Sequence, residues 1–198
     1  MNSIETPDWS QLPAPKDDGA AQHLAGAKWP NVALESTSGE RIDLSVLKGC
    51  SVVFAYPRTG RPGVENPPGW DLIPGARGCT PQSCAFRDRF AELKAAGVNR
   101  VFGLSTQVAE YQKEVADRLH LPFAILSDAE LKLTRALRLP TFEVAGRLDG
   151  QAEGQAPAIL LKRLTLMARD GRIEKVFYPV FPPDANADEV LSWFKVRQ

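Results

Sequence analysis

Two hydrophobic patterns alternate along the chain. Residues 51–56 form a continuous apolar run rich in β-branched and aromatic side chains, which is typical of a strand covered on both faces. Phe86, Phe90 and Leu93 then recur at helical spacing, and Gly97 ends that pattern. Further strands are indicated at 101–106 and 123–126, and further helices at 108–119 and 129–137. This alternation predicts a partly parallel sheet with helices on its faces.

Hairpin patterns flank this central part. The first pairs residues 32–34 with 41–44, and the second pairs residues 160–168 with 172–178, each across a turn that contains glycine. A last helix is expected over residues 186–196. The fold class that follows is α/β, a mixed central sheet flanked by helices, with an N-terminal hairpin.

Segments rich in proline and glycine divide the chain further. Residues 1–28 show no periodicity and are expected to form an arm that is laid over the body or left mobile, ahead of one domain at 29–198. Insertions are expected at about 58–75 and 145–157. The first forms a long loop directly before the helix at residue 80, either a flap over a site or a solvated insertion.

Composition narrows the class of partner. The chain has 198 residues, of which 43% are hydrophobic, so it can bury an ordinary core. Its 24 basic and 24 acidic residues leave no net charge, and this balance gives no electrostatic footprint for nucleic acid or an anionic membrane. A small substrate is therefore the expected partner.

The sequence shows no sign of export or membrane insertion. Met1 to Thr6 lack a basic start and an apolar run, and no stretch approaches the ~20 apolar residues of a membrane span. Three cysteines are too few for a secreted domain built on disulfides. We therefore expect a cytoplasmic protein whose cysteines serve chemistry or packing.

Candidate chemistry is concentrated in residues 78–84 (GCTPQSC), where the first insertion meets a helix. A helix N-terminus offers unpaired N–H groups and a partial positive charge, which favour the reactive thiolate form of a cysteine. Cys79 has that position, so this segment is interpreted as a redox site. Thr80 could be the N-cap of the helix, with Pro81 at its first position. Cys50 begins a strand and is expected to be a buried packing residue.

The sequence resembles the peroxiredoxins, specifically the peroxiredoxin Q group, also called bacterioferritin comigratory proteins, over about residues 30–197. A lone Cys-x4-Cys would be weak support, whereas six matching segments in the right order are strong. These segments are Val52 to Pro57, Gly78 to Asp88 (GCTPQSCAFRD), Gly103 to Thr106, Leu121 to Asp128, Arg163 to Thr165 and Asp170 to Ile173.

The resemblance implies a thioredoxin-like fold and a thiol-dependent peroxidase that reduces hydrogen peroxide or organic hydroperoxides. Cys79 would be the peroxidatic cysteine, Cys84 the resolving one, and Arg163 the family's strand arginine beside the thiolate. Electrons would come from thioredoxin or a glutaredoxin-like reductant. The chain is expected to be a monomer or a homodimer, with no cofactor and no metal.

The sequence departs from this family in the loop before the cysteine. The family pattern is Pro-x-x-x-Thr/Ser-x-x-Cys, but Ala76 stands three residues before Cys79 and Leu72 seven before it. The hydroxyl that should orient the peroxide is therefore missing there. Because residues 56–59 (YPRT) look like the start of that loop, we hypothesise that the insertion splits the motif and that the fold returns Thr59 to Cys79.

The spacing of Cys79 and Cys84 leaves two geometries open. In a regular helix, residues i and i+5 lie ~7.5 Å apart along the axis and point in different directions, too far for a disulfide. The helix start would then have to unwind. If Thr80 is the cap, the two cysteines would occupy positions whose side chains can touch, and less movement would be needed.

Plainer interpretations stay open for each residue. Arg163 could be an exposed strand residue paired with a carboxylate, Cys84 could be a packing residue, and Cys50 could resolve in its place. A second function is also open: a redox-responsive interaction protein, or peroxide sensor, in which oxidation of Cys79 changes a partner surface with little turnover. A protein disulfide oxidoreductase is disfavoured because the sequence has no Cys-x-x-Cys.

Overall fold

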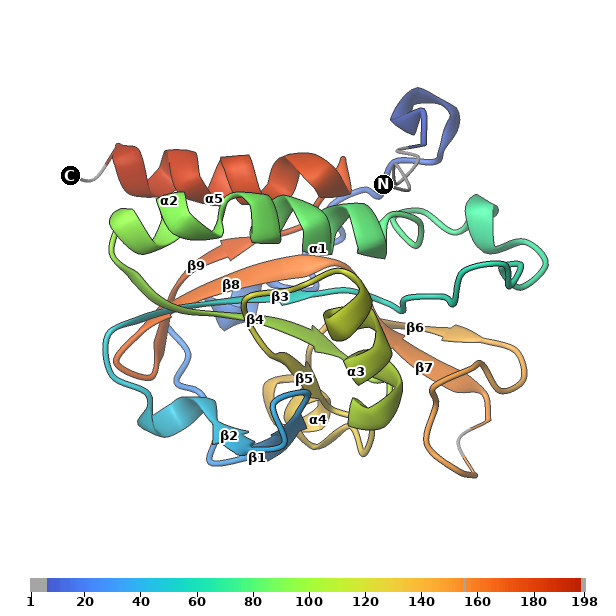
Figure 1. Ribbon diagram of the computed structural model, residues 1–198, viewed down its shortest axis with the longest axis horizontal. Coiled ribbons are helices and arrows are strands. Elements are labelled where there is room, and N and C mark those ends of the chain that lie inside the picture. Colours follow the sequence, from blue (N-terminus) through green and yellow to red (C-terminus); the bar gives the residue numbers. More distant parts are fainter. Residues whose placement is uncertain (1–6, 155, 197–198) are drawn as a thin grey trace.

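A seven-stranded mixed sheet forms the centre of the molecule, as seen in the computed structural model, which describes residues 7–154 and 156–196 (Figure 1). The strands lie side by side in the order β2-β1-β5-β4-β3-β8-β9, and β6 and β7 form a separate two-stranded sheet. The strands are β1 (Ala33–Ser36), β2 (Arg41–Asp43), β3 (Cys50–Ala55), β4 (Val98–Ser105), β5 (Ile125–Ser127), β6 (Thr141–Val144), β7 (Ala158–Leu161), β8 (Leu164–Arg169) and β9 (Arg172–Phe177).

The central strands run parallel, and the outer ones run antiparallel. β3, β4 and β5 are parallel neighbours, whereas β1–β2, β1–β5, β3–β8 and β8–β9 are antiparallel. The packing at Gly103 of β4 is close, because a Cβ there would come within 3.3 Å of side-chain atoms of both Ile125 and Phe54. The predicted partly parallel sheet and the first predicted hairpin are confirmed, and the second is confirmed for β8 and β9.

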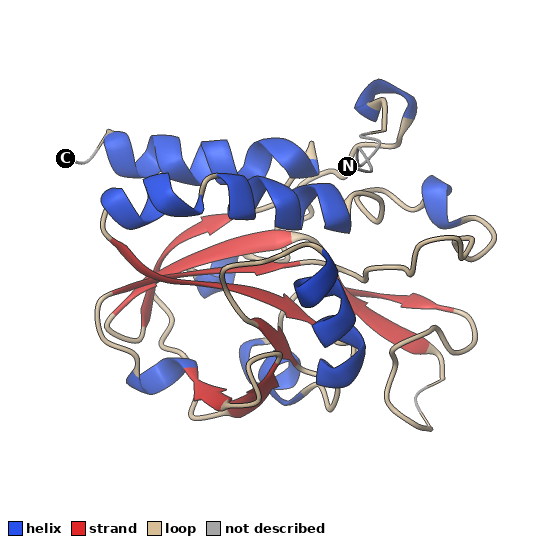
Figure 2. Cartoon of the chain, in the orientation of Figure 1, coloured by secondary structure: helices blue, strands red, loops and turns tan. Residues whose placement is uncertain are grey.

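Helices cover both faces of this sheet (Figure 2). On one side α1, α2 and α5 lie together, while α3 and α4 lie toward the opposite side (Figure 1). The helices are α1 (Cys79–Asp88), α2 (Phe90–Ala95), α3 (Ala109–Arg118), α4 (Lys132–Leu137) and α5 (Asn186–Lys195). Short 3-10 helices lie at Trp9–Gln11, Gln22–Leu24, Leu44–Val46, Trp70–Leu72 and Pro183–Ala185.

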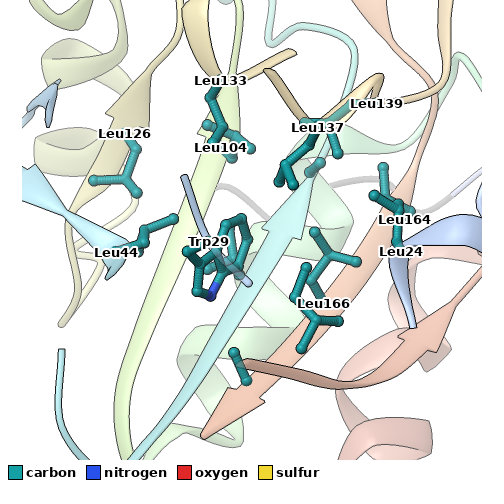
Figure 3. Close-up of a cluster of buried hydrophobic side chains, with 14 of the residues drawn as sticks. Leu24, Trp29, Leu44, Leu104, Leu126, Leu133, Leu137, Leu139, Leu164 and Leu166 are labelled. Carbon is teal, nitrogen blue, oxygen red and sulfur yellow. The ribbon is translucent and has the colours of Figure 1, made fainter. Parts of the chain in front are cut away.

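β3 separates two hydrophobic cores, which explains its uninterrupted apolar sequence. Side chains alternate across a strand, so Val53 and Ala55 join one cluster while Phe54 and Tyr56 join the other. The second cluster contains Phe86 of α1, whose ring stacks on Phe54 with a centroid separation of 4.3 Å. The first cluster gathers leucines of β4, β5, α4 and β8 around Trp29 (Figure 3).

The second insertion is part of a hairpin that the sequence did not indicate. Residues 145–157 connect β6 to β7, which pair antiparallel. The single strand predicted over 160–168 is therefore two strands, and the prediction is wrong at Lys162 and Arg163. Leu161 pairs with Thr141 in the small sheet, whereas Leu164 pairs with Ala55 in the large one. Arg163 thus lies in the break between two strands.

The start of α1 also differs from one sequence prediction. Cys79 is the first helical residue and Gly78 is the N-cap, with a left-handed φ of 100° and no side-chain cap, so the prediction of Thr80 as the cap is wrong. The positive φ at Gly78 turns the backbone sharply from the loop into the helix, and glycine adopts this conformation without strain. The helix is interrupted at Arg89, where α2 begins, and Gly97 follows the end of α2.

The described part of the arm, residues 7–28, is laid over the body. Leu24 is fully buried in the first core, and the Trp9 indole Nε1 donates to Asp184 Oδ2 at 2.9 Å. Met1 to Thr6, on which the expectation of no export signal rested, lie outside the described residues. Across residues 7–154 and 156–196, no helix is long and apolar enough to cross a membrane.

Candidate active site

Cys79 stands where the first insertion ends and α1 begins. Its side chain is buried, with 4% exposed, and its Sγ lies 3.2 Å from Nη2 of Arg163. The thiol also lies 3.6 Å from the carbonyl oxygen of Ala76, to which it donates. The first N–H groups of α1 have no acceptor within the helix, so the sulfur lies at the positive end of the helix dipole.

Arg163 reaches the sulfur from the break between β7 and β8. It is 3% exposed, and its Nη2 also donates to the carbonyl oxygens of Arg77 at 3.0 Å and of Gly75 and Ala76 at 3.3 Å. The plainer alternative, an exposed arginine paired with a carboxylate, is therefore wrong. Neutral oxygens and the sulfur are its acceptors, so the positive charge is left to compensate a thiolate.

A buried polar network holds Arg163 in place, and the sequence analysis missed it. Arg163 Nη1 donates to Oε1 of Gln82, and Gln82 Nε2 donates to Oδ1 of Asn186 at 3.0 Å. Asn186 Oδ1 also accepts from the Thr165 hydroxyl at 2.6 Å. Gln82 follows Cys79 by three residues and precedes Phe86 by four, so a polar side chain on the apolar face of α1 was a signal available in the sequence.

The Thr59 hydroxyl is bonded to Gln107, so its proposed role in orienting a peroxide at Cys79 stays a prediction. Thr59 and Cys79 line one pocket. The backbone of Thr59 is held on both sides by Gln107: Thr59 N donates to Gln107 Oε1 at 2.9 Å, and Gln107 Nε2 donates to Thr59 O at 3.0 Å. The Thr59 hydroxyl is 3.3 Å from the same Oε1. Gln107 is a positioning residue that the sequence analysis did not single out.

The pocket that exposes the site has a volume of about 310 Å³. Its walls combine the start of the first insertion, the turn before α1, the first residues of α1, and Trp70. Residues 61–66 of the insertion are exposed, whereas Arg58 and Thr59 are buried. The insertion therefore begins inside the site and then extends over it, as a flap would.

Cys84 lies one and a half turns along the same helix and packs in a different place. It is 8% exposed and belongs to a cluster with Val115 of α3 and Leu119, which directly follows α3, whereas Cys79 belongs to the cluster of Phe54 and Phe86. Burial raises the pKa of the Cys84 thiol. Because both cysteines lie in the continuous helix α1, the regular-helix geometry applies, and a disulfide requires the helix start to unwind.

Cys50 is remote from this site. It is fully buried at the start of β3, and burial raises its pKa to about 11. Tyr56 directly follows β3, six residues after Cys50. Burial is the largest cause of its raised pKa, and the negative charge of the nearby Cys79 thiolate raises this pKa further. Six residues of strand span about 20 Å. Cys50 is therefore placed to pack, and not to react with Cys79.

The described residues offer no group of three or more histidine, cysteine or carboxylate side chains arranged to hold a metal ion. What the site does offer is a buried sulfur next to a fixed cation, backbone N–H groups and an open pocket. Such an arrangement can stabilise a thiolate and the negative charge that develops on an oxygen leaving group.

Comparison with known proteins finds redoxins and peroxiredoxins that match most of the chain. A family model described as redoxin matches residues 24–191. Peroxiredoxin Bcp of Escherichia coli (strain K12) is 31% identical over 172 residues, covering 86% of this chain and 95% of that protein. Chloroplastic peroxiredoxin Q of Sedum lineare is 29% identical over 181 residues, covering 91% of this chain and 82% of that protein.

Solved structures share the fold. Peroxidoxin BcpB from Mycobacterium tuberculosis superposes with a TM-score of 0.65 at 24% identity, covering 88% of this chain and 98% of the other. A peroxiredoxin Q structure from Xanthomonas campestris superposes with a TM-score of 0.61 at 20% identity, covering 83% and 90%. The expected thioredoxin-like arrangement, a mixed sheet with flanking helices, is confirmed.

Proposed function

The chain belongs to the redoxin family and to its peroxiredoxin Q and Bcp members, and on that premise we propose that Cys79 is the sulfur at which it reduces hydroperoxides. The protein is a thiol-dependent peroxidase. The observation that carries the assignment of the residue is the 3.2 Å separation between Arg163 Nη2 and Cys79 Sγ inside an open pocket.

The first step oxidises the sulfur. The Cys79 thiolate attacks one peroxide oxygen; an S–O bond forms, the O–O bond breaks, and the departing oxygen takes up a proton to leave as water or an alcohol. Sulfur loses two electrons and becomes a sulfenic acid, while the peroxide gains them. Arg163 stays protonated throughout, so it can favour the thiolate and then donate to the oxygen as charge moves outward.

The second step protects the sulfur from further oxidation. The Cys84 thiolate attacks the sulfenic sulfur of Cys79; an S–S bond forms and the hydroxyl leaves with a proton as water. The buried position of Cys84 against α3 and the continuous helix between the two cysteines support a local unwinding of α1 before this step. The Cys79–Cys84 pairing is part of the proposal.

A dithiol reductant then returns the protein to its starting state, its own two thiols becoming a disulfide. The class of reductant follows from the family, and thioredoxin or a glutaredoxin-like protein is our proposal for this chain. We also propose that it acts as a monomer or a homodimer. Steady-state oxidation of NADPH, coupled through thioredoxin reductase and thioredoxin or through glutathione and glutaredoxin, distinguishes the two reductants.

The assignment of Cys79 is tested by mass spectrometry after one equivalent of hydrogen peroxide. We expect a Cys79–Cys84 disulfide in the wild-type chain, a stable sulfenic acid at Cys79 in Cys84→Ser, and no peroxide consumption by Cys79→Ser. Cys50→Ser is the matched control and should turn over like the wild type. Peroxide turnover that persists in Cys79→Ser, or a disulfide that includes Cys50, would contradict the proposal.

A further inference from the structure

The pocket above Cys79 is strongly cationic. Four arginines line it, and none of the described residues in its wall is acidic. Two of the four are neutralised from outside the pocket, because Arg77 forms an ion pair with Asp71 at 2.7 Å and Arg118 forms one with Glu114 at 2.7 Å. The other two arginines, Arg58 and Arg61, form no ion pair within the described part of the chain.

Arg58 is the unusual member of this pair. Only 6% of it is exposed, and its Nε is buried without a hydrogen-bond partner among residues 7–154 and 156–196. Its one specific contact is with the ring of Trp70, whose centroid lies 5.5 Å from the guanidinium carbon. Arg61 is exposed and stacks similarly over Tyr111 at 4.9 Å.

A buried guanidinium without an anionic partner is energetically unfavourable, and an aromatic ring compensates it only in part. Arg58 lines the pocket, so an anion that enters the pocket would give this guanidinium a charged acceptor. Its planar fork fits a carboxylate, which can accept two parallel N–H bonds. The negative charge of a Cys79 thiolate does not exclude a second anion, because Arg163 Nη2 compensates that charge from 3.2 Å.

Resting on the proposed peroxidase function, we infer that the preferred substrate is an organic hydroperoxide that carries a carboxylate. Arg58 binds the carboxylate, Arg61 adds positive charge at the pocket mouth, and Trp70 covers the apolar part of the molecule. Arg58 and Cys79 line the same pocket of about 310 Å³, so a molecule that fills it would meet both. A volume of about 310 Å³ suits a compact organic acid.

The test compares three hydroperoxides of one shape: cumene hydroperoxide, its para-carboxylate and the methyl ester of that carboxylate. We measure kcat/KM for each with the wild-type chain at fixed ionic strength. We expect the carboxylate to react about tenfold faster than its ester, since a charge-assisted pair in a partly buried site contributes at least this factor. Equal values for acid and ester would overturn the inference.

Variants show whether Arg58 causes the preference. In Arg58→Met the ratio of acid to ester should fall to about one, and in Arg58→Lys, which keeps the charge, part of the ratio should return. Arg41→Met on β2, which removes an exposed arginine at the far edge of the sheet, should leave the ratio unchanged. A ratio that persists in Arg58→Met would assign the preference to another group and overturn the role of Arg58.

A binding measurement separates this inference from the peroxidase function. The unreactive acid 4-isopropylbenzoate should bind the reduced wild-type chain in calorimetry, and its methyl ester should bind about tenfold more weakly. If no hydroperoxide is consumed but the acid still binds selectively, the proposed function fails while the anion site stands. If hydroperoxides are consumed and the acid does not bind, the anion site fails alone. These measurements need no variant to fold.

Discussion

Arg163 and Cys79 meet although 84 residues separate them in the chain, with Nη2 3.2 Å from Sγ. The contact depends on a break in the strand: β7 ends at Leu161 in one sheet and β8 begins at Leu164 in another. A residue between two strands is not bound to the alternation of either, so its side chain can turn toward the helix start. The charge that this contact supplies underlies the first prediction.

Arg163→Met should slow the reaction of Cys79 with hydrogen peroxide about 100-fold to 1000-fold, because a preorganised donor to the developing charge is lost. Stopped-flow fluorescence with peroxide in excess measures this rate. Arg163→Lys keeps the charge but loses the fork that reaches both Gln82 and the sulfur, so its rate should be intermediate. A methionine variant as fast as the wild type would contradict the role of Arg163.

Thr59→Val should lower the same rate about tenfold while preserving the backbone bonds to Gln107, because only the hydroxyl that can orient the peroxide is removed. Thr106→Val is the matched control. It removes an equally buried hydroxyl, bonded to the carbonyl of Ile159 at 2.8 Å and absent from the pocket wall. If both variants react alike, the displaced threonine has no catalytic role.

Disulfide formation should unwind the start of α1. Hydrogen exchange followed by mass spectrometry is expected to show faster exchange in residues 79–86 of the oxidised chain than of the reduced one. Cys84→Ser treated with the same peroxide is the control, and its exchange should stay at the reduced level. Unchanged protection in a chain that carries the Cys79–Cys84 bond would show that the helix accommodates the disulfide without unwinding.

Cys50 should be nearly inert to alkylation in the folded chain at pH 8. Burial raises its pKa to about 11, so the reactive thiolate is about one part in a thousand at that pH. Because this pKa lies above pH 8, the rate of alkylation by iodoacetamide should rise about tenfold per pH unit until the pH nears 11. Peptide mass spectrometry identifies the labelled sulfur, and the chain unfolded in guanidinium is the reference. Equal labelling rates in the folded and unfolded chain would refute the burial argument.

Gly78→Ala should reduce the free energy of unfolding by about 2 kcal/mol or more, because it combines a left-handed backbone with a steric clash. A Cβ at Gly78 would lie 2.6 Å from Cη2 of Trp9 and 2.7 Å from Cγ of Pro183. Gly97→Ala is the matched control, with a similar positive φ and no atom within 4 Å of its Cβ. Denaturant unfolding of both variants separates the steric clash from the backbone effect. Equal decreases in the free energy of unfolding would mean that Trp9 and Pro183 move away from the added Cβ at no cost.

Much of the sheet could be predicted from periodicity, because its strongest signals are local. The apolar run of β3 and the spacing of Phe86, Phe90 and Leu93 each reflect one element and the surface it covers. The sequence match likewise brought Cys79 and Arg163 together as an expectation, and their placement agrees with it. The β6–β7 hairpin was missed because its two short strands pair across the long segment 145–157, and no local pattern reports that pairing.

The polar part of the site was harder to predict for the same reason. Gln107 and Arg58 have partners that the fold brings from other segments, and neither stands out in the sequence. Gln82 alone could have been noticed, as a polar residue on the apolar face of α1. The Thr80 cap was predicted from a local preference, but the left-handed turn at Gly78 starts the helix two residues earlier, at Cys79. Tertiary packing of Trp9 and Pro183 against Gly78 favours that turn over the local signal.

Trp9 of the N-terminal arm packs against Gly78 at the start of α1, so the arm can influence how long the Cys79 sulfenic acid persists. Whatever opens the first turn of α1 must also move the indole that rests on it, so the arm adds to the barrier that delays sulfur–sulfur bonding. A longer delay leaves the sulfenic acid open to a second molecule of oxidant. We therefore expect removal of the arm to shift the oxidant dose at which the enzyme is inactivated, although no residue that touches the sulfur would change.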